Sequence, residues 1–285
     1  MPLVTFGVRL REAMDLHGPL CAGIDPHRAL VESWGLEYSL AGVERFALTC
    51  VEALGAEVAV VKPQSAFFEV FGSAGVRVLE RVLADLREAG TLSLLDVKRG
   101  DIGSTMQAYA EAYLGKDSAL RADAVTLSPF LGYGSLRPAL DLAEETGRGV
   151  FVLALTSNAE GPEVQHAERD GRSVAATVVG GAAADNAAAA ARGELGSVGL
   201  VVGATVGDAV ERLDLDLAAA NAPVLAPGLG AQGGTPQTLR CVFGEALSNV
   251  LASSSRDVLS AGPHAADLRA AARDAAYQLR QVLTV

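Results

Sequence analysis

The segment Asp96-Val97-Lys98-Arg99-Gly100-Asp101-Ile102-Gly103-Ser104-Thr105 follows the apolar run Leu92-Ser93-Leu94-Leu95. The run is typical of a buried strand, and residues 106–114 after the segment have the pattern of a helix. The charged residues are therefore predicted at the carboxyl end of a strand. Because side chains alternate along a strand, Asp96 and Lys98 are expected on one face, whereas the loop sets the direction of Asp101.

Eight apolar runs of this kind alternate with segments of helical pattern. Such alternation predicts parallel pairing through crossovers, and eight units predict closure into a (β/α)8 TIM barrel. We expect one α/β domain over residues 1–285, with an extra N-terminal helix at 5–17 across the amino end of the barrel. The predicted strands are 20–24, 58–61, 92–95, 124–127, 150–155, 198–202, 224–226 and 250–252. The predicted helices include 40–54, 74–89, 136–146, 174–192, 208–219, 238–247 and 265–283.

Composition narrows the class of protein. A formal net charge of −11 over 285 residues argues against non-specific nucleic-acid binding, which needs a basic face. No uninterrupted apolar run approaches the roughly 18 residues that span a membrane, and the N-terminus lacks the pattern of a secretory signal. We therefore expect a cytoplasmic protein without membrane contact. Three widely spaced cysteines indicate neither a disulfide framework nor a zinc site.

Polar or charged residues follow nearly every predicted strand. In a TIM barrel the active site is built at these carboxyl ends. A single Asp-x-Lys pair can be a structural ion pair, and Ser104 or Thr105 can simply cap a helix. Two lysines and two aspartates at one barrel mouth, however, are costly to desolvate without a function. These four residues are Asp25, Lys62, Asp96 and Lys98.

The ends of the last two strands suit an anion. Glycines at 228, 230, 233 and 234 free the backbone to aim N–H groups at a ligand, although such a cluster alone can also be a plain turn. Arg256 offers a planar fork that fits phosphate oxygens. Barrels commonly bind phosphate after strands seven and eight, so we predict a phosphate site here, with Gln232 beside it.

In the order and spacing of these motifs, the chain resembles the orotidine 5′-monophosphate decarboxylase family, in particular a bacterial subgroup with a DVKRGDIGST core. The resemblance covers the whole chain. Besides residues 96–105, it includes LCAGIDP at 20–26, VKPQSAFFE at 61–69, PFLGYG at 129–134, TSN at 156–158, PGLGAQGG at 227–234 and SSSR at 253–256.

The resemblance implies a carboxy-lyase that converts orotidine 5′-monophosphate (OMP) to UMP and CO2 in pyrimidine biosynthesis, with no cofactor and no metal. Lys98 would stabilise the developing carbanion and protonate it. A homodimer is implied, in which Asp101, Ile102 and Thr105 reach the neighbouring subunit's site. The implied catalytic array is Lys62, Asp96, Lys98 and Asp101. The implied substrate contacts are Asp25 to ribose, Ser157 and Gln232 to the base or the far end of the substrate, Arg256 to phosphate, and Pro227 and Gly233 in the glycine-rich loop.

Two other functions remain open at this point. Metal-assisted barrels that act on sugar phosphates, as decarboxylases or aldolases, also carry DxKxxD, but they place a carboxylate where this chain has Lys62. A non-catalytic nucleotide-binding barrel is the second alternative, and the presence of Asp96 and Lys98 argues against it. His27, which stands near a strand end, is interpreted as a loop residue that hydrogen-bonds locally. Where the subgroup usually continues Pro-Gly after TSN, this chain has Ala159-Glu160-Gly161, so the course of that loop is not predicted.

Overall fold

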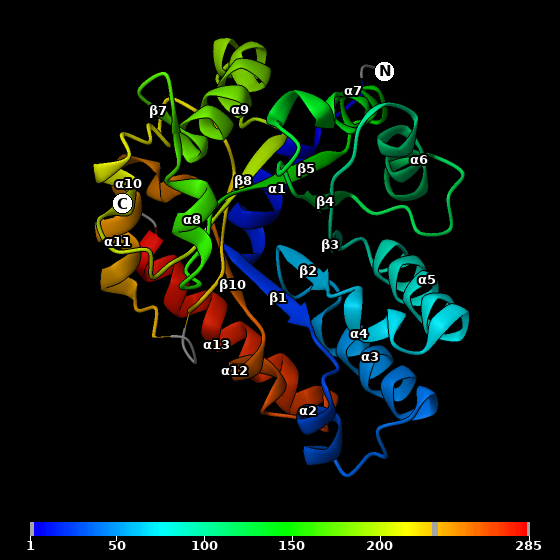
Figure 1. Cartoon of the computed structure of the whole chain (residues 1–285). Coiled ribbons are helices and arrows are strands. Elements are labelled where there is room, and N and C mark those ends of the chain that lie inside the picture. The colour runs from blue at the N-terminus through cyan, green and yellow to red at the C-terminus, as the bar shows by residue number, and fades with distance from the viewer. Residues whose placement is uncertain (1–2, 230–232, 284–285) are drawn as a thin grey trace.

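The computed structural model describes residues 3–229 and 233–283, in which eight parallel strands close into a barrel (Figure 1). The strands follow one another around the barrel in the order β1-β10-β9-β8-β5-β4-β3-β2. The predicted TIM barrel is therefore confirmed. The strands are β1 (Leu20–Ile24), β2 (Val60–Pro63), β3 (Leu92–Arg99), β4 (Ala124–Leu127), β5 (Gly149–Leu155), β8 (Val198–Val202), β9 (Val224–Ala226) and β10 (Val250–Ser254).

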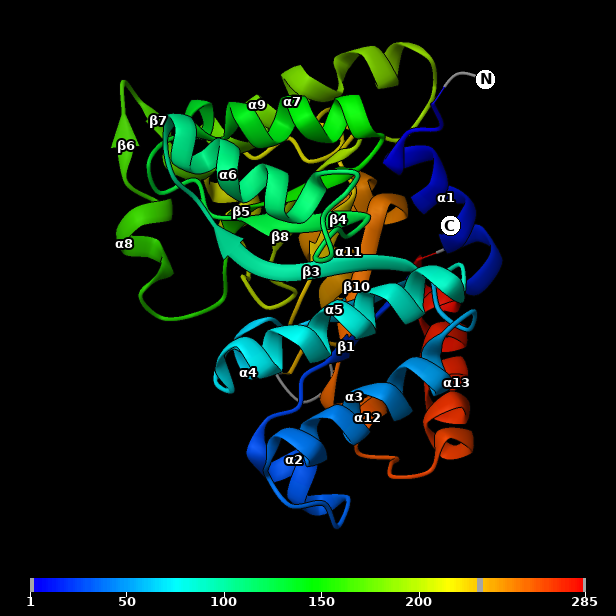
Figure 2. The same ribbon diagram turned by 90° about the vertical axis from the view of Figure 1, so that its right-hand side faces the viewer.

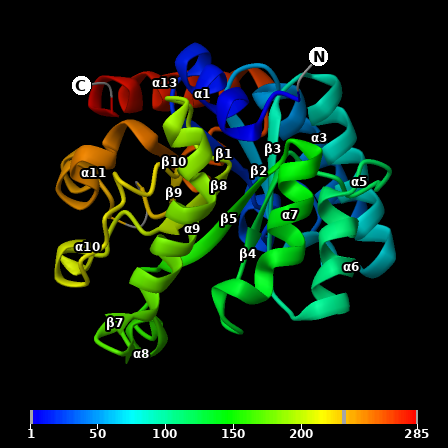
Figure 3. The ribbon, with the colours of Figure 1, turned by 90° about the horizontal axis from the view of Figure 1, so that it is seen from above.

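Helices surround the barrel, as the view from above shows (Figure 3). The longer ones are α1 (Phe6–His17), α3 (Leu40–Leu54), α5 (Gly72–Glu88), α6 (Gly103–Leu114), α7 (Arg137–Thr146), α9 (Val174–Ala191), α11 (Pro236–Phe243) and α13 (Ala265–Leu283). The shorter elements are α2 (Arg28–Ser33), α4 (Ala66–Glu69), η1 (Tyr133–Leu136), α8 (Gly161–Gln165), α10 (Ala209–Arg212), η3 (Gly244–Asn249), α12 (Arg256–Leu259) and the hairpin strands β6 (Glu168–Arg169) and β7 (Arg172–Ser173). By length and composition α9 could span a membrane, but here it packs on β5 and β8.

Two predicted helices differ from the structure. The helix expected at 208–219 is reduced to α10, because Asp214 adopts a left-handed backbone with φ of 52°. The carboxylate of Asp216 then accepts the N–H of Ala219 at 2.8 Å, a local bond that competes with a helix. The helix expected at 238–247 ends at Phe243, because Gly244, at φ of 45°, begins a 3-10 turn.

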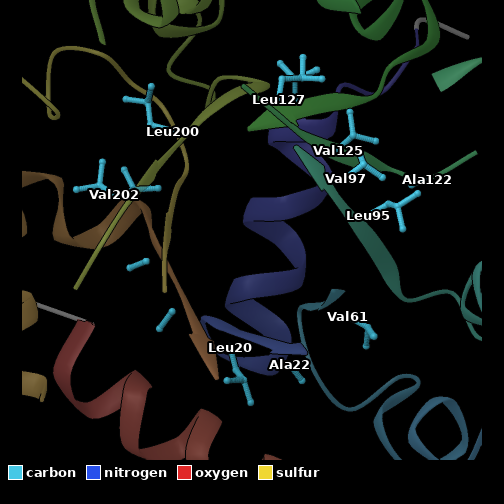
Figure 4. Packing of buried hydrophobic residues seen from close by; sticks show 14 of the residues in the cluster. Leu20, Ala22, Val61, Leu95, Val97, Ala122, Val125, Leu127, Leu200 and Val202 are labelled. Atoms are coloured by element: carbon cyan, nitrogen blue, oxygen red, sulfur yellow. The ribbon is translucent and has the colours of Figure 1, made fainter. Parts of the chain in front are cut away.

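Alternation along the strands sorts apolar side chains onto two faces. The outward set packs beneath the helices, and Figure 4 shows Leu20, Val61 and Leu95 pointing away from the barrel centre. The inward set forms a separate cluster that includes Val60, Leu94 and members of the remaining strands. Because both faces of each strand are buried, the strand sequences are nearly continuous runs of apolar residues.

The N-terminal helix α1 closes the amino end of the barrel, as predicted. The Phe6 ring meets the Phe151 ring edge to face, with 6.0 Å between centroids. Gly149 leaves room for this contact, since a Cβ there would lie 2.3 Å from the Phe6 ring. Figures 2 and 3 show α1 and the α8–β7 segment at opposite ends of the barrel. Because α1 covers the amino end, a site can form only at the carboxyl end, where the α8–β7 segment lies.

Candidate active site

A cavity of about 320 Å³ opens at the carboxyl ends of the strands. Every barrel strand contributes to its lining, either within the strand or directly after it. The convergence predicted from the strand ends is therefore observed. One residue from each strand in chain order is Asp25, Lys62, Asp96, Thr126, Leu153, Val201, Leu225 and Ser253.

Asp96 is the centre of the polar network in this cavity and is 5% exposed. Its Oδ2 accepts hydrogen bonds from Lys62 Nζ at 3.1 Å and from Gln64 Nε2 at 2.9 Å. Its Oδ1 accepts from Lys98 Nζ at 2.6 Å and from Thr126 Oγ1 at 2.7 Å. Four donors thus satisfy one buried carboxylate, which is what a buried charge requires.

The two lysines differ in their surroundings. Lys62 is 6% exposed, and the side chain of Lys98 is about half exposed toward the cavity. Burial alone lowers the pKa of Lys62, but Asp96 and Asp25 outweigh it and hold that pKa above its ordinary value. Burial raises the pKa of Asp96, and the nearby Lys62 and Lys98 outweigh this and hold it well below the usual carboxyl range. Lys62 and Asp96 are therefore both charged at neutral pH.

Lys98 reaches the cavity through a bulge rather than through regular alternation. The β3–β4 register pairs Leu95 with Val125 and Arg99 with Leu127, so three residues of β3 lie opposite Thr126 alone. Lys98 has a φ of 44°, a conformation that residues with a Cβ seldom adopt. Asp96 and Lys98 do share one wall of the cavity, as predicted, but the bulge in β3 brings Lys98 there, not regular alternation alone.

Arg256 follows β10, and the described glycines 228, 233 and 234 follow the neighbouring strand β9. Arg256 lines the cavity together with Pro227 and Gly228. Gly234 N–H donates to Gly228 O at 2.9 Å, and a Cβ on Gly234 would lie 2.4 Å from that oxygen, so only glycine fits. Gly233 has a φ of 86°. Within the described part of the chain, no ion pair or hydrogen bond engages the Arg256 guanidinium. The predicted residue Gln232 lies outside the described residues.

Two polar atoms near the end of β1 are buried without a hydrogen-bond partner among the described residues. They are Asp25 Oδ1 and His27 Nε2, and both residues line the cavity. The His27 ring lies 5.9 Å from the Phe67 ring, centroid to centroid. His27 was expected to hydrogen-bond locally, but its Nε2 makes no hydrogen bond to the described residues. Buried polar atoms in this state call for a further partner, either a ligand or an ordered water.

Five predicted residues, Gly233 among them, do not line the cavity of their own chain. Asp101 Oδ1 accepts the N–H of Ile102 at 2.8 Å, and Ile102 is 61% exposed. Thr105 is exposed on the first turn of α6. Ser157 is exposed, while its neighbour Thr156 lines the cavity.

The loop after β5, whose course was not predicted, leads into α8. Gln165 Oε1 accepts the N–H of Thr156 at 2.8 Å, and Gln165 Nε2 donates to Thr156 Oγ1 at 2.6 Å. Asn158 Nδ2 donates to Glu160 Oε2 at 3.0 Å. The loop is therefore held close to the strand end by side-chain amides, with Pro162 in the first turn of α8.

Sequence reasoning missed several lining or bonding residues, among them Gln64, Phe67, Thr126 and Asp257. Thr126 could have been found, because alternation from Ala124 places it on the inner face of an otherwise apolar strand. For Gln64 no such signal exists, since it follows the strand. Among residues 3–229 and 233–283, no group of three or more His, Cys, Asp or Glu side chains is arranged to hold a metal ion.

Comparison with known proteins gives consistent matches. Residues 18–271 match the model of the orotidine 5′-phosphate decarboxylase / HUMPS family. An orotidine 5′-phosphate decarboxylase of Streptomyces coelicolor is 58% identical over 282 residues, which is 98% of each chain. A crystal structure from Streptomyces avermitilis, assigned to the same activity, aligns with a TM-score of 0.94 at 58% identity and covers 100% of this chain and 98% of its own. The OMP decarboxylase of Leishmania donovani aligns with a TM-score of 0.77 at 30% identity, over 99% of this chain and 100% of its own.

Proposed function

The chain belongs to the orotidine 5′-phosphate decarboxylase / HUMPS family, and on this premise we propose how its barrel cavity converts OMP to UMP and CO2. The activity is that of a carboxy-lyase in pyrimidine biosynthesis. The observation that carries the proposal is the Asp96-centred network, in which Lys62 and Lys98 flank one carboxylate inside a cavity of about 320 Å³.

The chemistry needs a fixed positive charge and a proton. Breaking the bond between the ring carbon and the carboxylate releases CO2 and leaves the electron pair on the ring carbon. The Lys98 ammonium, already oriented by Asp96 Oδ1 at 2.6 Å, stabilises that pair and then donates its proton to the carbon. Asp96 lies beside the departing carboxylate and orients Lys98 through the hydrogen bond from its Nζ. Lys62 balances the charge of Asp96 and stays protonated.

The rest of the cavity fits the other parts of a nucleotide. Asp25, with an unpartnered Oδ1, accepts a ribose hydroxyl, and Arg256 binds the 5′-phosphate beside Pro227 and Gly228, which line the same cavity. Gly233, which does not line the cavity, would contact the phosphate through its backbone. Ser157 and Gln232 contact the base or the far end of the substrate. This places phosphate binding far from the reacting carbon, where its energy can be used to order the loops around the substrate.

Replacing Arg256 by alanine should raise KM for OMP by about 10- to 100-fold, with a smaller effect on kcat, because a charge-assisted contact to phosphate is lost. Steady-state kinetics measure the change. Arg240→Ala is the matched control, since Arg240 is exposed on α11 and does not line the cavity. An unchanged KM in Arg256→Ala would contradict the phosphate assignment.

A homodimer is part of the proposal. The loops after β3 and β4 touch, since a Cβ at Gly100 would lie 2.2 Å from Ser128 O. They carry the exposed apolar residues Ile102, Phe130 and Leu131, at 61%, 75% and 53% exposure. Such residues gathered on adjoining loops are typical of an interface. We propose that this surface pairs with a second copy and that Asp101, Ile102 and Thr105 complete the partner's cavity.

We also propose that residues 1–285 act as one domain in the cytoplasm. The three cysteines are free thiols, with Cys241 exposed, which fits a reducing compartment. Neither a membrane nor a nucleic acid is expected as a partner.

Ultraviolet absorbance distinguishes the proposed function from its two alternatives. We expect conversion of OMP to UMP without added metal and undiminished by a chelator such as EDTA. Strict dependence on magnesium would favour the metal-assisted sugar-phosphate enzymes of the same family. Binding of OMP without turnover by folded protein would favour a nucleotide-binding barrel.

A further inference from the structure

Thr126 lies on β4 at the base of the cavity and is fully buried. Its Oγ1 accepts the backbone N–H of Val97 at 3.0 Å and the backbone N–H of Lys98 at 3.0 Å. It donates to Asp96 Oδ1 at 2.7 Å. One hydroxyl therefore contacts three consecutive residues of the segment that carries the catalytic charges.

These three bonds use the whole capacity of the hydroxyl, which has one proton and two acceptor positions. The two backbone N–H groups can only donate, so they occupy the acceptor positions. The hydroxyl proton must then point to Asp96 Oδ1. That oxygen also accepts from Lys98 Nζ at 2.6 Å, so it has to be unprotonated.

The bulge in β3 explains why a hydroxyl is needed at this place. Three residues of β3 lie between the pairs Leu95–Val125 and Arg99–Leu127, opposite Thr126 alone. The extra residues lose the regular ladder, and their N–H groups need another acceptor. Thr126 Oγ1 supplies it for both Val97 and Lys98, at the point where Lys98 takes its left-handed φ of 44°.

We propose that Thr126 is a positioning residue for decarboxylation, whose hydroxyl fixes the bulge and so sets Lys98 Nζ against Asp96. The inference rests on the proposed function of the cavity. The side chain of Lys98 is about half exposed, and within the described chain Asp96 is the one side chain bonded to its Nζ. Its direction therefore depends on the backbone that Thr126 holds.

Thr126→Val keeps the volume of the side chain and removes the hydroxyl. We expect kcat to fall about 100-fold with little change in KM, because a misplacement near 1 Å of a reacting group has an effect of this size. Thr126→Ser, which keeps the hydroxyl, should recover most of the lost kcat. A folded Thr126→Val protein with wild-type kcat would overturn the proposal, as would a Ser variant as impaired as the Val variant.

Thr91→Val is the matched control. Thr91 is 5% exposed, and its Oγ1 likewise accepts a backbone N–H, from Ala56 at 2.7 Å, next to the opposite end of β3. We expect this variant to lose stability but to keep kcat. An equal fall in kcat in Thr91→Val would show that loss of any buried hydroxyl lowers kcat, and the proposal would be wrong.

Amide hydrogen exchange gives a readout that does not depend on turnover. In Thr126→Val, or in Thr126→Ala should the valine variant not fold, the Val97 and Lys98 amides should exchange faster than in the wild type. Unchanged exchange overturns the proposal. A wild-type protein that does not turn over OMP would instead contradict the proposed function, and the exchange rates would still show whether Thr126 holds the bulge.

Discussion

Replacing Lys98 by alanine is expected to abolish decarboxylation and leave the fold intact. The residue is assigned two tasks, protonation of the ring carbon and electrostatic stabilisation of the developing charge. Each is worth on the order of 10²- to 10³-fold or more, so we expect a loss in kcat of at least about 10⁴-fold. The fold should survive, because Asp96 keeps hydrogen bonds from Lys62, Gln64 and Thr126.

The measurement is kcat by the decrease in OMP absorbance, with a thermal melt to establish folding and a binding assay with UMP. The matched control is Lys116→Ala, since Lys116 is the one other lysine outside Lys62 and Lys98 and is exposed. It should behave as the wild type. A Lys98→Ala protein with near-normal kcat would remove Lys98 from the mechanism.

Much of the barrel was predictable because its strands are short and buried on both faces. The predicted bounds of β1, β4, β8 and β9 agree with the structure. A short apolar run bounded by polar residues is a strong signal of a strand when the barrel interior on one face and the helices on the other both exclude water. The region around α10 was not predictable in this way, because Asp214 and Asp216 turn the chain through local backbone and side-chain preferences.

The charged array was predictable because strand ends in a barrel converge. Asp25, Lys62, Asp96 and Lys98 all line the same cavity. The bond between Lys98 and Asp96 was not predictable, because it depends on a bulge in β3. A regular strand does not contain a residue with a φ of 44°, so alternation alone does not predict the backbone of Lys98. Only the β3–β4 register shows which backbone N–H groups need Thr126 as an acceptor. Neutral hydroxyls and amides such as Thr126 and Gln64 carry no charge pattern that singles them out in a sequence.

Mixing two inactive variants tests whether the site is shared between subunits. Asp101 does not line the cavity of its own chain, and its Oδ1 accepts the N–H of Ile102 on an exposed apolar loop. If Asp101 acts in the partner's cavity, both Lys98→Ala and Asp101→Ala lose activity alone. Random exchange of subunits makes about half of the dimers hybrid, each with one intact site, so activity should return to about a quarter of the wild-type value.

The control pairs Lys98→Ala with Asp96→Asn, whose two residues are bonded to each other within one chain. In a hybrid of these two, each site lacks one of the residues, so no activity should return. Light scattering measures the dimer, and mass spectrometry of differently tagged subunits measures the hybrids. If hybrids form between Lys98→Ala and Asp101→Ala and remain inactive, Asp101 does not act across the interface. The exposed apolar residues Ile102, Phe130 and Leu131 on the two adjoining loops would then need another explanation, because a cavity complete within one chain gives no reason to pair through them.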